Sequence, residues 1–202
     1  MTAAAIAATG VDERSASGPL SGEHLRILAA ARARGKKVRR AAKVAAFSGG
    51  TMMLFAAATL IGGLFGDWTS LVLGIILAAI AYIELRGGAM LGRFEPGAAR
   101  LLGYNQMLLA VVIIAYAAWS LLMALRSPML AQLRGATGDP QMEEMVGQIA
   151  TWTTYGLYGC IAFAGLIGPP MTALYYFSRA RLVRAMLAET PPWAIETLRV
   201  AG

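Results

Sequence analysis

The side chains of this sequence that could do chemistry are few and widely separated. His24 is the only histidine and Cys160 the only cysteine in the 202-residue chain. A single histidine cannot supply a pair of haem ligands, and zinc sites draw on several histidine, cysteine or carboxylate ligands. Cys160 lies among small apolar residues, where a packing role outweighs nucleophilic catalysis. We therefore expect no catalytic, cofactor-binding or metal-binding site, and a protein that is not an enzyme.

One group of polar residues could form a binding site where apolar segments end. Glu84 could pair with an arginine, and the neighbouring Asn105 and Gln106 could hydrogen-bond across helices. The group would then bind a lipid headgroup or a partner protein. The alternative is ordinary capping of helices at the membrane edge. The members of this group are Tyr82, Glu84, Arg86, Arg100, Asn105, Gln106 and Arg179.

Ionisable residues deep in a membrane span would mark a path for protons or ions. The long apolar segments contain none, because Glu84 falls at the end of one segment and Asp67 in the turn before it. This distribution argues against an ion-coupled transporter.

Four long segments without a charged residue are candidates for the helices that position these side chains. The chain is 57% hydrophobic and only 14% charged, whereas soluble domains carry about 25% charged residues. These charge-free windows cover residues 44–66, 68–83, 101–125 and 145–178. A helix needs about 20 apolar residues to cross a bilayer. The second window is shorter than this, so it spans only if Glu84 and Arg86 lie at the membrane edge and reach toward water.

We therefore predict an all-α membrane protein whose four transmembrane helices form two helical hairpins. The membrane domain covers residues 44–178, with spans at about 44–65, 68–85, 104–125 and 149–177. Gly66 and Asp67 form the turn of the first hairpin, because glycine ends helices and aspartate starts them. Two short outer helices should begin at Ser127-Pro128 and Asp139-Pro140, the second continuous with the fourth span.

The distribution of lysine and arginine predicts the orientation of the chain. Residues 1–43 hold nine of these residues, the 86–103 connection three, and the segment from 179 onward four, which is sixteen of the eighteen. With four spans, these three segments lie on one side of the membrane. The positive-inside rule makes that side cytoplasmic. Both termini are thus expected in the cytoplasm, in a bacterial-type plasma (inner) membrane.

The segments outside the bilayer differ in composition. Residues 1–20 have little to bury and should form a disordered tail. Ser21 can cap a basic juxtamembrane helix over 21–43 that runs into the first span. The cytoplasmic tail at 179–202 should contain a short amphipathic helix after its proline pair. The residues expected to lie on the inner membrane surface are Trp193, Ile195 and Leu198.

Seven basic residues directly precede the first span, and they could contact anionic lipid. Each such residue near a membrane surface contributes about 1 kcal/mol. A topology signal without lipid binding is the alternative. Nucleic acid is disfavoured as a partner, because no aromatic residue interleaves these charges. The seven residues are Arg32, Arg34, Lys36, Lys37, Arg39, Arg40 and Lys43.

Small residues recur at every fourth position of the last span: Gly156, Cys160, Ala164 and Gly168. Residues at this spacing share one face of a helix, and small residues allow two helices to approach closely in lipid. We call this set the small-residue face. The expected contact is with another helix of the same chain, and dimerisation is the alternative.

No feature of the sequence specifies a reaction or a substrate. The expected function is that of a non-enzymatic scaffold, regulatory or accessory subunit of a membrane assembly. Its partners would be the lipid bilayer, anionic lipids on the cytoplasmic face and other membrane protein subunits. An oligomeric permease or channel component is the alternative, and a lipid-modifying enzyme is the third hypothesis.

Overall fold

The computed structural model describes residues 21–126 and 140–200. This part of the chain is all-helical, without a strand, and four of its helices are long and apolar enough to cross a membrane. The prediction of an all-α protein with four candidate spans is therefore confirmed. The helices are α1 (Gly22–Leu64), α2 (Trp68–Gly92), α3 (Ala98–Arg126), α5 (Pro140–Glu189) and α6 (Pro192–Val200).

Helix α1 runs without interruption from the basic segment into the apolar one. Ser21 caps its start, and the Ser21 hydroxyl oxygen accepts a hydrogen bond from the His24 backbone N–H at 3.3 Å. The helix ends before Gly66, whose φ of +97° suits glycine. Asp67 then caps α2 by accepting from the Thr69 N–H at 3.0 Å. The Ser70 hydroxyl also donates to Asp67, and this bond holds the pKa of the Asp67 carboxyl below its ordinary value.

Helices α1 and α2 pack along each other, and glycines make the approach possible. A Cβ atom on Gly63 would lie 2.8 Å from the backbone Cα of Leu71, and one on Gly74 would lie 2.7 Å from the side chain of Leu60. Both distances are below normal van der Waals contact. The two helices therefore touch through their backbones at these points, which only glycine permits.

Helices α3 and α5 form a second packed pair. A Cβ atom on Gly103 of α3 would lie 2.5 Å from the Phe177 ring, and one on Gly165 of α5 would lie 2.6 Å from Ile113. Helix α5 continues through Pro169 and Pro170 over 50 residues. It begins at Pro140, where one of the two outer helices was expected to start. The other expected start, at Ser127-Pro128, lies outside the described residues. The expected disordered tail at 1–20 also lies outside them.

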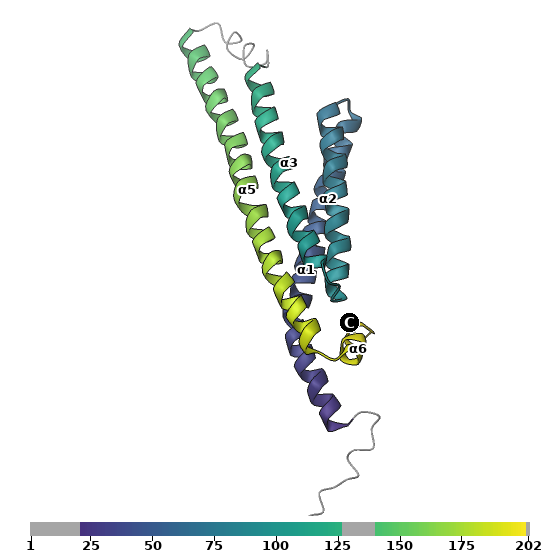
Figure 1. The fold of residues 1–202 in the computed structure, drawn as a ribbon. Helices are drawn as coiled ribbons and strands as arrows, with labels where there is room; N and C mark the ends of the chain where they lie inside the picture. Colours follow the sequence, from purple (N-terminus) through teal and green to yellow (C-terminus); the bar gives the residue numbers. More distant parts are fainter. Residues whose placement is uncertain (1–20, 127–139, 201–202) are drawn as a thin grey trace, which may run out of the picture.

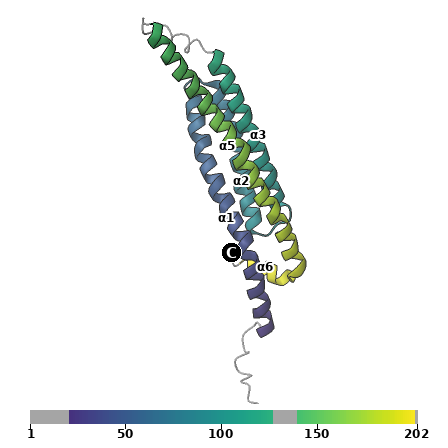
Figure 2. The same ribbon diagram turned by 90° about the vertical axis from the view of Figure 1, so that its left-hand side faces the viewer.

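The two helix pairs meet at one end of the molecule and diverge toward the other (Figure 1). Figure 2 shows the same helices from the side, running roughly along one direction. The larger core cluster lies at the shared end and takes residues from all five helices. Its largest fully buried members are Val38, Leu91, Phe94, Leu102, Tyr176 and Met186. A smaller cluster of Met52, Ile80, Ala81 and Leu109 lies between α1, α2 and α3.

The short helix α6 packs against the protein. Ile195 and Leu198 are 7% and 5% exposed, and Leu198 belongs to the larger core cluster. Arg39 of α1 donates to the Leu198 carbonyl at 2.6 Å, and Trp193 meets the His24 ring edge to face. The expectation that Ile195 and Leu198 lie on the membrane surface is therefore wrong. An amphipathic pattern indicates that one face is buried, and here α1 covers that face instead of lipid.

Candidate functional site

Glu84 is a carboxylate at the centre of the buried face of α2, and none of it is exposed. The buried residues of this helix recur every three or four positions, from Ile80 through Glu84 to Gly88 and Leu91. Such spacing defines the face that a helix turns toward its neighbours. Helical periodicity therefore directs the Glu84 side chain into the bundle, between α2, α3 and α5.

Three neutral side chains donate hydrogen bonds to the Glu84 carboxylate. Asn105 Nδ2 lies 2.8 Å from Oε2, Gln106 Nε2 lies 2.9 Å from Oε1, and the Tyr176 hydroxyl lies 2.9 Å from Oε1. Asn105 and Gln106 belong to α3 and Tyr176 to α5. We call these four residues the Glu84 cluster. They join three helices around one acceptor, and all four side chains are buried.

The cluster leaves one acceptor unused. Asn105 Nδ2 also donates to the Ile80 carbonyl at 3.0 Å, so the amide is fixed on its donor side. Asn105 Oδ1 is buried and has no hydrogen-bond partner among the described residues. Leaving a buried acceptor unpaired costs about 1–3 kcal/mol. The position of the Glu84 carboxyl oxygen and the Ile80 carbonyl explains this orientation, because both accept hydrogen bonds and the Asn105 NH₂ group donates to both.

The structure brings together only part of the polar group expected from the sequence. Glu84, Asn105 and Gln106 meet, whereas Tyr82, Arg86 and Arg100 are exposed. Arg179 lies over the Tyr175 ring at 4.6 Å, with its Nε buried and unpartnered within the described part of the chain. Both ion pairs found in that part lie elsewhere, so no arginine pairs with Glu84.

One expectation about Glu84 is corrected by this geometry. Its side chain does not reach water at the membrane edge, because three helices enclose it. Helix α2 continues past Glu84 to Gly92, so this residue lies within a helix that is long and apolar enough to cross a membrane. A charge-free window ends at the first charged residue, although such a side chain can be buried when hydrogen-bond donors surround it.

Tyr176 is the member of the cluster that was not predicted from the sequence. It shares one buried stripe of α5 with Ala173, Ala180 and Val183, at spacings of three and four residues. That periodicity was available in the sequence and places Tyr176 inward. The adjacent Tyr175 is only half-buried, so two tyrosines next to each other in the sequence have different surroundings.

The seven basic residues of the α1 segment divide into two groups. Arg34 forms an ion pair with Glu189 at 3.1 Å, and Arg39 donates to the Leu198 carbonyl and lies over the Phe94 ring. These two cations hold the end of α5 and α6 against α1. The other five are exposed and lack a partner within residues 21–126 and 140–200. They are Arg32, Lys36, Lys37, Arg40 and Lys43.

The small-residue face of α5 packs against no other helix of the chain. All four of its residues are exposed, and a Cβ on Gly156 or Gly168 would meet nothing within 4 Å. The expectation of an intramolecular contact is therefore wrong. Helix α5 meets α3 through Gly165 instead, one position away from Ala164. One residue turns the direction of a side chain by about 100°, so the small-residue face points away from α3.

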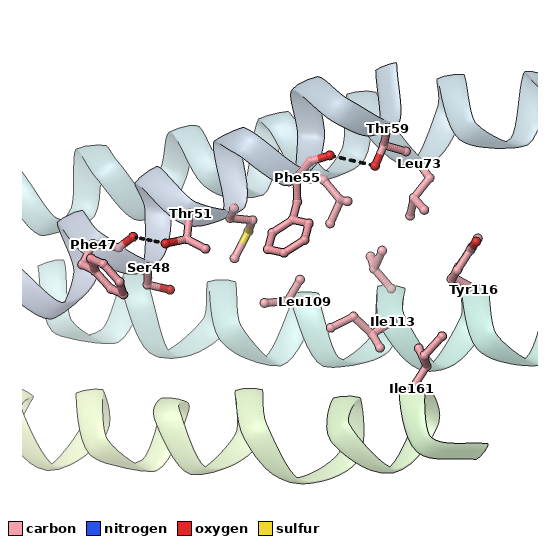
Figure 3. Close-up of a pocket in the computed structure, with 13 residues that line it drawn as sticks. Phe47, Ser48, Thr51, Phe55, Thr59, Leu73, Leu109, Ile113, Tyr116 and Ile161 are labelled. Carbon is pink, nitrogen blue, oxygen red and sulfur yellow. Dashed lines mark hydrogen bonds between the residues drawn. The ribbon is translucent and has the colours of Figure 1, made fainter. Parts of the chain in front are cut away.

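A groove of about 550 Å³ runs between the two helix pairs and is open on one side. Figure 3 shows Phe47, Thr51 and Phe55 of α1 facing Leu109 and Ile113 of α3 across it. Its lining is almost entirely apolar. The groove is separate from the Glu84 cluster, since it shares no residue with it.

The part of the chain that the structure describes thus presents a buried polar cluster, an apolar groove, five cations without a partner among the seven of the basic segment, and a face of α5 that no other helix covers. Among the described residues, no group of three histidine, cysteine, aspartate or glutamate side chains could hold a metal ion. The chain matches no protein-family model, no curated protein and no solved structure.

Proposed function

We propose that this chain is a non-enzymatic accessory or scaffold subunit of a membrane assembly, and that a partner helix packs on the small-residue face of α5. The supporting observation is the exposure of that face. In its most apolar 18-residue window, α5 is only 11% buried, compared with 22% for α1 and α2 and 17% for α3. The helix with the least internal contact therefore carries the residues best suited to close helix packing.

The physical reason lies in the nature of the bilayer. Lipid tails are as apolar as leucine, so helices in a membrane associate through close packing. Small residues let two backbones approach, and dispersion contacts between the helices then replace weaker contacts with lipid. Gly156, Cys160, Ala164 and Gly168 offer such a surface over more than three turns of α5.

The topology proposed with this function is two helical hairpins with both termini in the cytoplasm of a plasma-type membrane. The basic half of α1, the end of α5 and α6 lie at the same end of the molecule (Figure 1). The same end thus collects most of the lysine and arginine, which favours the cytoplasmic side.

Labelling of single cysteines tests this topology. In a Cys160→Ala background, we expect Glu144→Cys at the start of α5 to react with an impermeant thiol reagent added to intact cells. Pro96→Cys, between α2 and α3, should react only after permeabilisation. Both positions are exposed in the folded chain, so access depends on the side of the membrane. Reaction of Pro96→Cys in intact cells would contradict the proposed topology.

Substitution on α5 tests the partner face. We expect Ala164→Leu to release the partner, measured as a fall in the mass of the complex purified in mild detergent. The melting temperature of the separated chain should stay the same, because Ala164 is exposed. The matched control is Gly165→Leu, whose side chain would meet Ile113 and should lower the melting temperature. Gly168 is less suitable, because a side chain before a proline clashes with its ring.

The mass of that complex also separates the two leading functions. A hetero-complex that Ala164→Leu dissociates supports the accessory subunit. An intact complex in this variant contradicts the proposed face. A complex of identical chains supports the alternative function, an oligomeric permease or channel component.

One observation favours this alternative. Glu84 follows Trp68 by 16 residues, a rise of about 24 Å along α2. If Trp68 lies at one interface, Glu84 lies inside the hydrocarbon layer, which is about 30 Å thick. Buried carboxylates at such depth serve proton or ion transfer in many transport proteins. The complete set of donors around Glu84 and its lack of exposure favour a structural role, so the permease remains the second proposal.

A further inference from the structure

The groove between the helix pairs is as large as a small-molecule site, and its lining is apolar, as a site for a lipid chain requires. Its volume of about 550 Å³ lies within the range of about 300–1,000 Å³ typical of small-molecule sites. The hydroxyls of Thr51 and Thr59 do not face an occupant as free donors, because they donate to the Phe47 and Phe55 carbonyls of their own helix. An occupant of this groove therefore meets apolar walls along most of its length.

The length and the lining of the groove suit an acyl chain. From Phe47 to Thr59 the groove follows α1 for 12 residues, or about 18 Å. A helix with its side chains is about 10–12 Å in diameter, which is much wider than a single acyl chain. An acyl chain is thinner and wholly apolar, and the surrounding bilayer supplies it at high concentration.

Basic side chains of α1 lie near one end of this groove. Lys43 precedes Phe47 by four residues, so the two side chains share a face of α1 one turn apart. Arg40 and Lys36 continue along α1 toward the basic end. All three cations are exposed and have no partner in the described ranges, whereas Arg34 and Arg39 are engaged within the chain. The three cations on the groove side of α1 are therefore available to an anionic group.

Ser48 lies between the cations and the apolar walls. It lines the groove next to Phe47, and its hydroxyl has no partner within the described segments. A phospholipid has the same order of groups along its length: an anionic phosphate, ester carbonyls and an apolar chain. Lys43, Ser48 and the groove present a cation, a hydroxyl donor and an apolar surface in matching order.

We propose that the groove binds one acyl chain of an anionic phospholipid from the surrounding bilayer, with the phosphate held by Lys43 and Arg40. This site depends on the chain being embedded in a membrane and does not depend on the partner face of α5. The helix pairs diverge in Figure 1, and bound lipid would fill the groove between them that Figure 3 shows.

Lipid titration of the full-length protein in detergent tests the site, with native mass spectrometry as the readout. The probes are phosphatidylglycerol and phosphatidylcholine with identical palmitoyl and oleoyl chains. We expect phosphatidylglycerol to bind more tightly. Lys43→Gln with Arg40→Gln should weaken it about 30-fold and bring it close to phosphatidylcholine. The charge-matched control, Lys37→Gln with Arg26→Gln, should weaken it by less than threefold.

Filling the groove tests the acyl-chain part of the proposal. Val112→Trp should reduce binding of both lipids at least tenfold, because Val112 lines the groove. Val111→Trp is the matched control, since the adjacent Val111 is 62% exposed and lies outside the groove. Ser48→Leu is a second groove variant in case Val112→Trp lowers the melting temperature. Both groove variants keep the full positive charge of α1.

Four results would overturn the site. Unchanged binding in both groove variants would show that lipid contacts only the basic segment. Equal affinity for the two lipids would remove the cations from the site, and an equal loss in the charge-matched control would leave only general electrostatic attraction. A change of oligomeric state in Val112→Trp, without a change in lipid binding, would assign the groove to a helix. Lipid binding should persist in Ala164→Leu, so failure of the α5 partner face leaves this site intact.

Discussion

Glu84→Ala is expected to lower the free energy of unfolding by about 3–5 kcal/mol. The substitution removes the acceptor for Asn105, Gln106 and Tyr176, all of which are buried. Asn105 keeps its bond to the Ile80 carbonyl, whereas the Gln106 amide and the Tyr176 hydroxyl lose theirs. Each buried donor without a partner costs about 1–3 kcal/mol, and the vacated volume adds to the loss. The measurement is denaturant or thermal unfolding in detergent.

Glu84→Gln distinguishes hydrogen bonding from charge at this site. The amide oxygen can still accept from Gln106 and Tyr176, while the new NH₂ group faces Asn105. Asn105 Oδ1 has no partner in the described part of the chain, so a turned Asn105 amide can accept from that group at the expense of its bond to Ile80. We therefore expect Glu84→Gln to lose well under half of what Glu84→Ala loses.

Glu196→Ala is the matched control for the alanine substitution. The Glu196 side chain is 69% exposed, and its ion pair with Arg199 lies on the surface. Surface pairs contribute about 0–1 kcal/mol, so this variant should stay near the parent protein. If Glu84→Ala is as stable as Glu196→Ala, the cluster does not hold α2, α3 and α5 together, and the permease hypothesis gains weight.

Composition was sufficient to predict the four apolar helices. The bilayer requires long runs without charge, and such runs are visible in one sequence without any knowledge of contacts. The polar cluster was only partly predictable. Asn105 and Gln106 were expected to hydrogen-bond across helices, but the partner of Glu84 was sought among arginines. The actual arrangement supplies neutral donors from other helices, and only the tertiary packing brings them to Glu84.

Contact faces were harder to predict than helices. Periodicity identified a small-residue face on α5 but not which side of α5 meets α3, and the observed contact uses Gly165, adjacent to Ala164. Likewise, the pattern of α6 predicted a buried side without indicating whether lipid or α1 covers it. A single sequence contains the spacing of small or apolar residues, whereas the neighbour depends on how several helices pack at once.

Substitution of glycines between α1 and α2 is expected to give the second large loss of stability. The sequence alone does not show which of these glycines tolerate a side chain. We expect Gly63→Ala to lower the free energy of unfolding by about 2 kcal/mol, within the range for overpacking. The new Cβ would lie 2.8 Å from both the Cα and the N of Leu71. These are backbone atoms, so no side-chain rotation can relieve the contact, and α1 must move away from α2.

Gly50→Ala is the matched control on the same helix, and its expected effect has the opposite sign. A Cβ on Gly50 would meet nothing within 4 Å, so alanine only restricts the unfolded chain and favours the helix. Such changes stabilise by about 0.4–1 kcal/mol. Gly74→Ala should repeat the loss of Gly63→Ala, because its Cβ would lie 2.9 Å from the backbone N of Leu60. If all three alanines stabilise the protein in thermal unfolding, α1 and α2 are not in backbone contact, and the tight pairing of these helices is wrong.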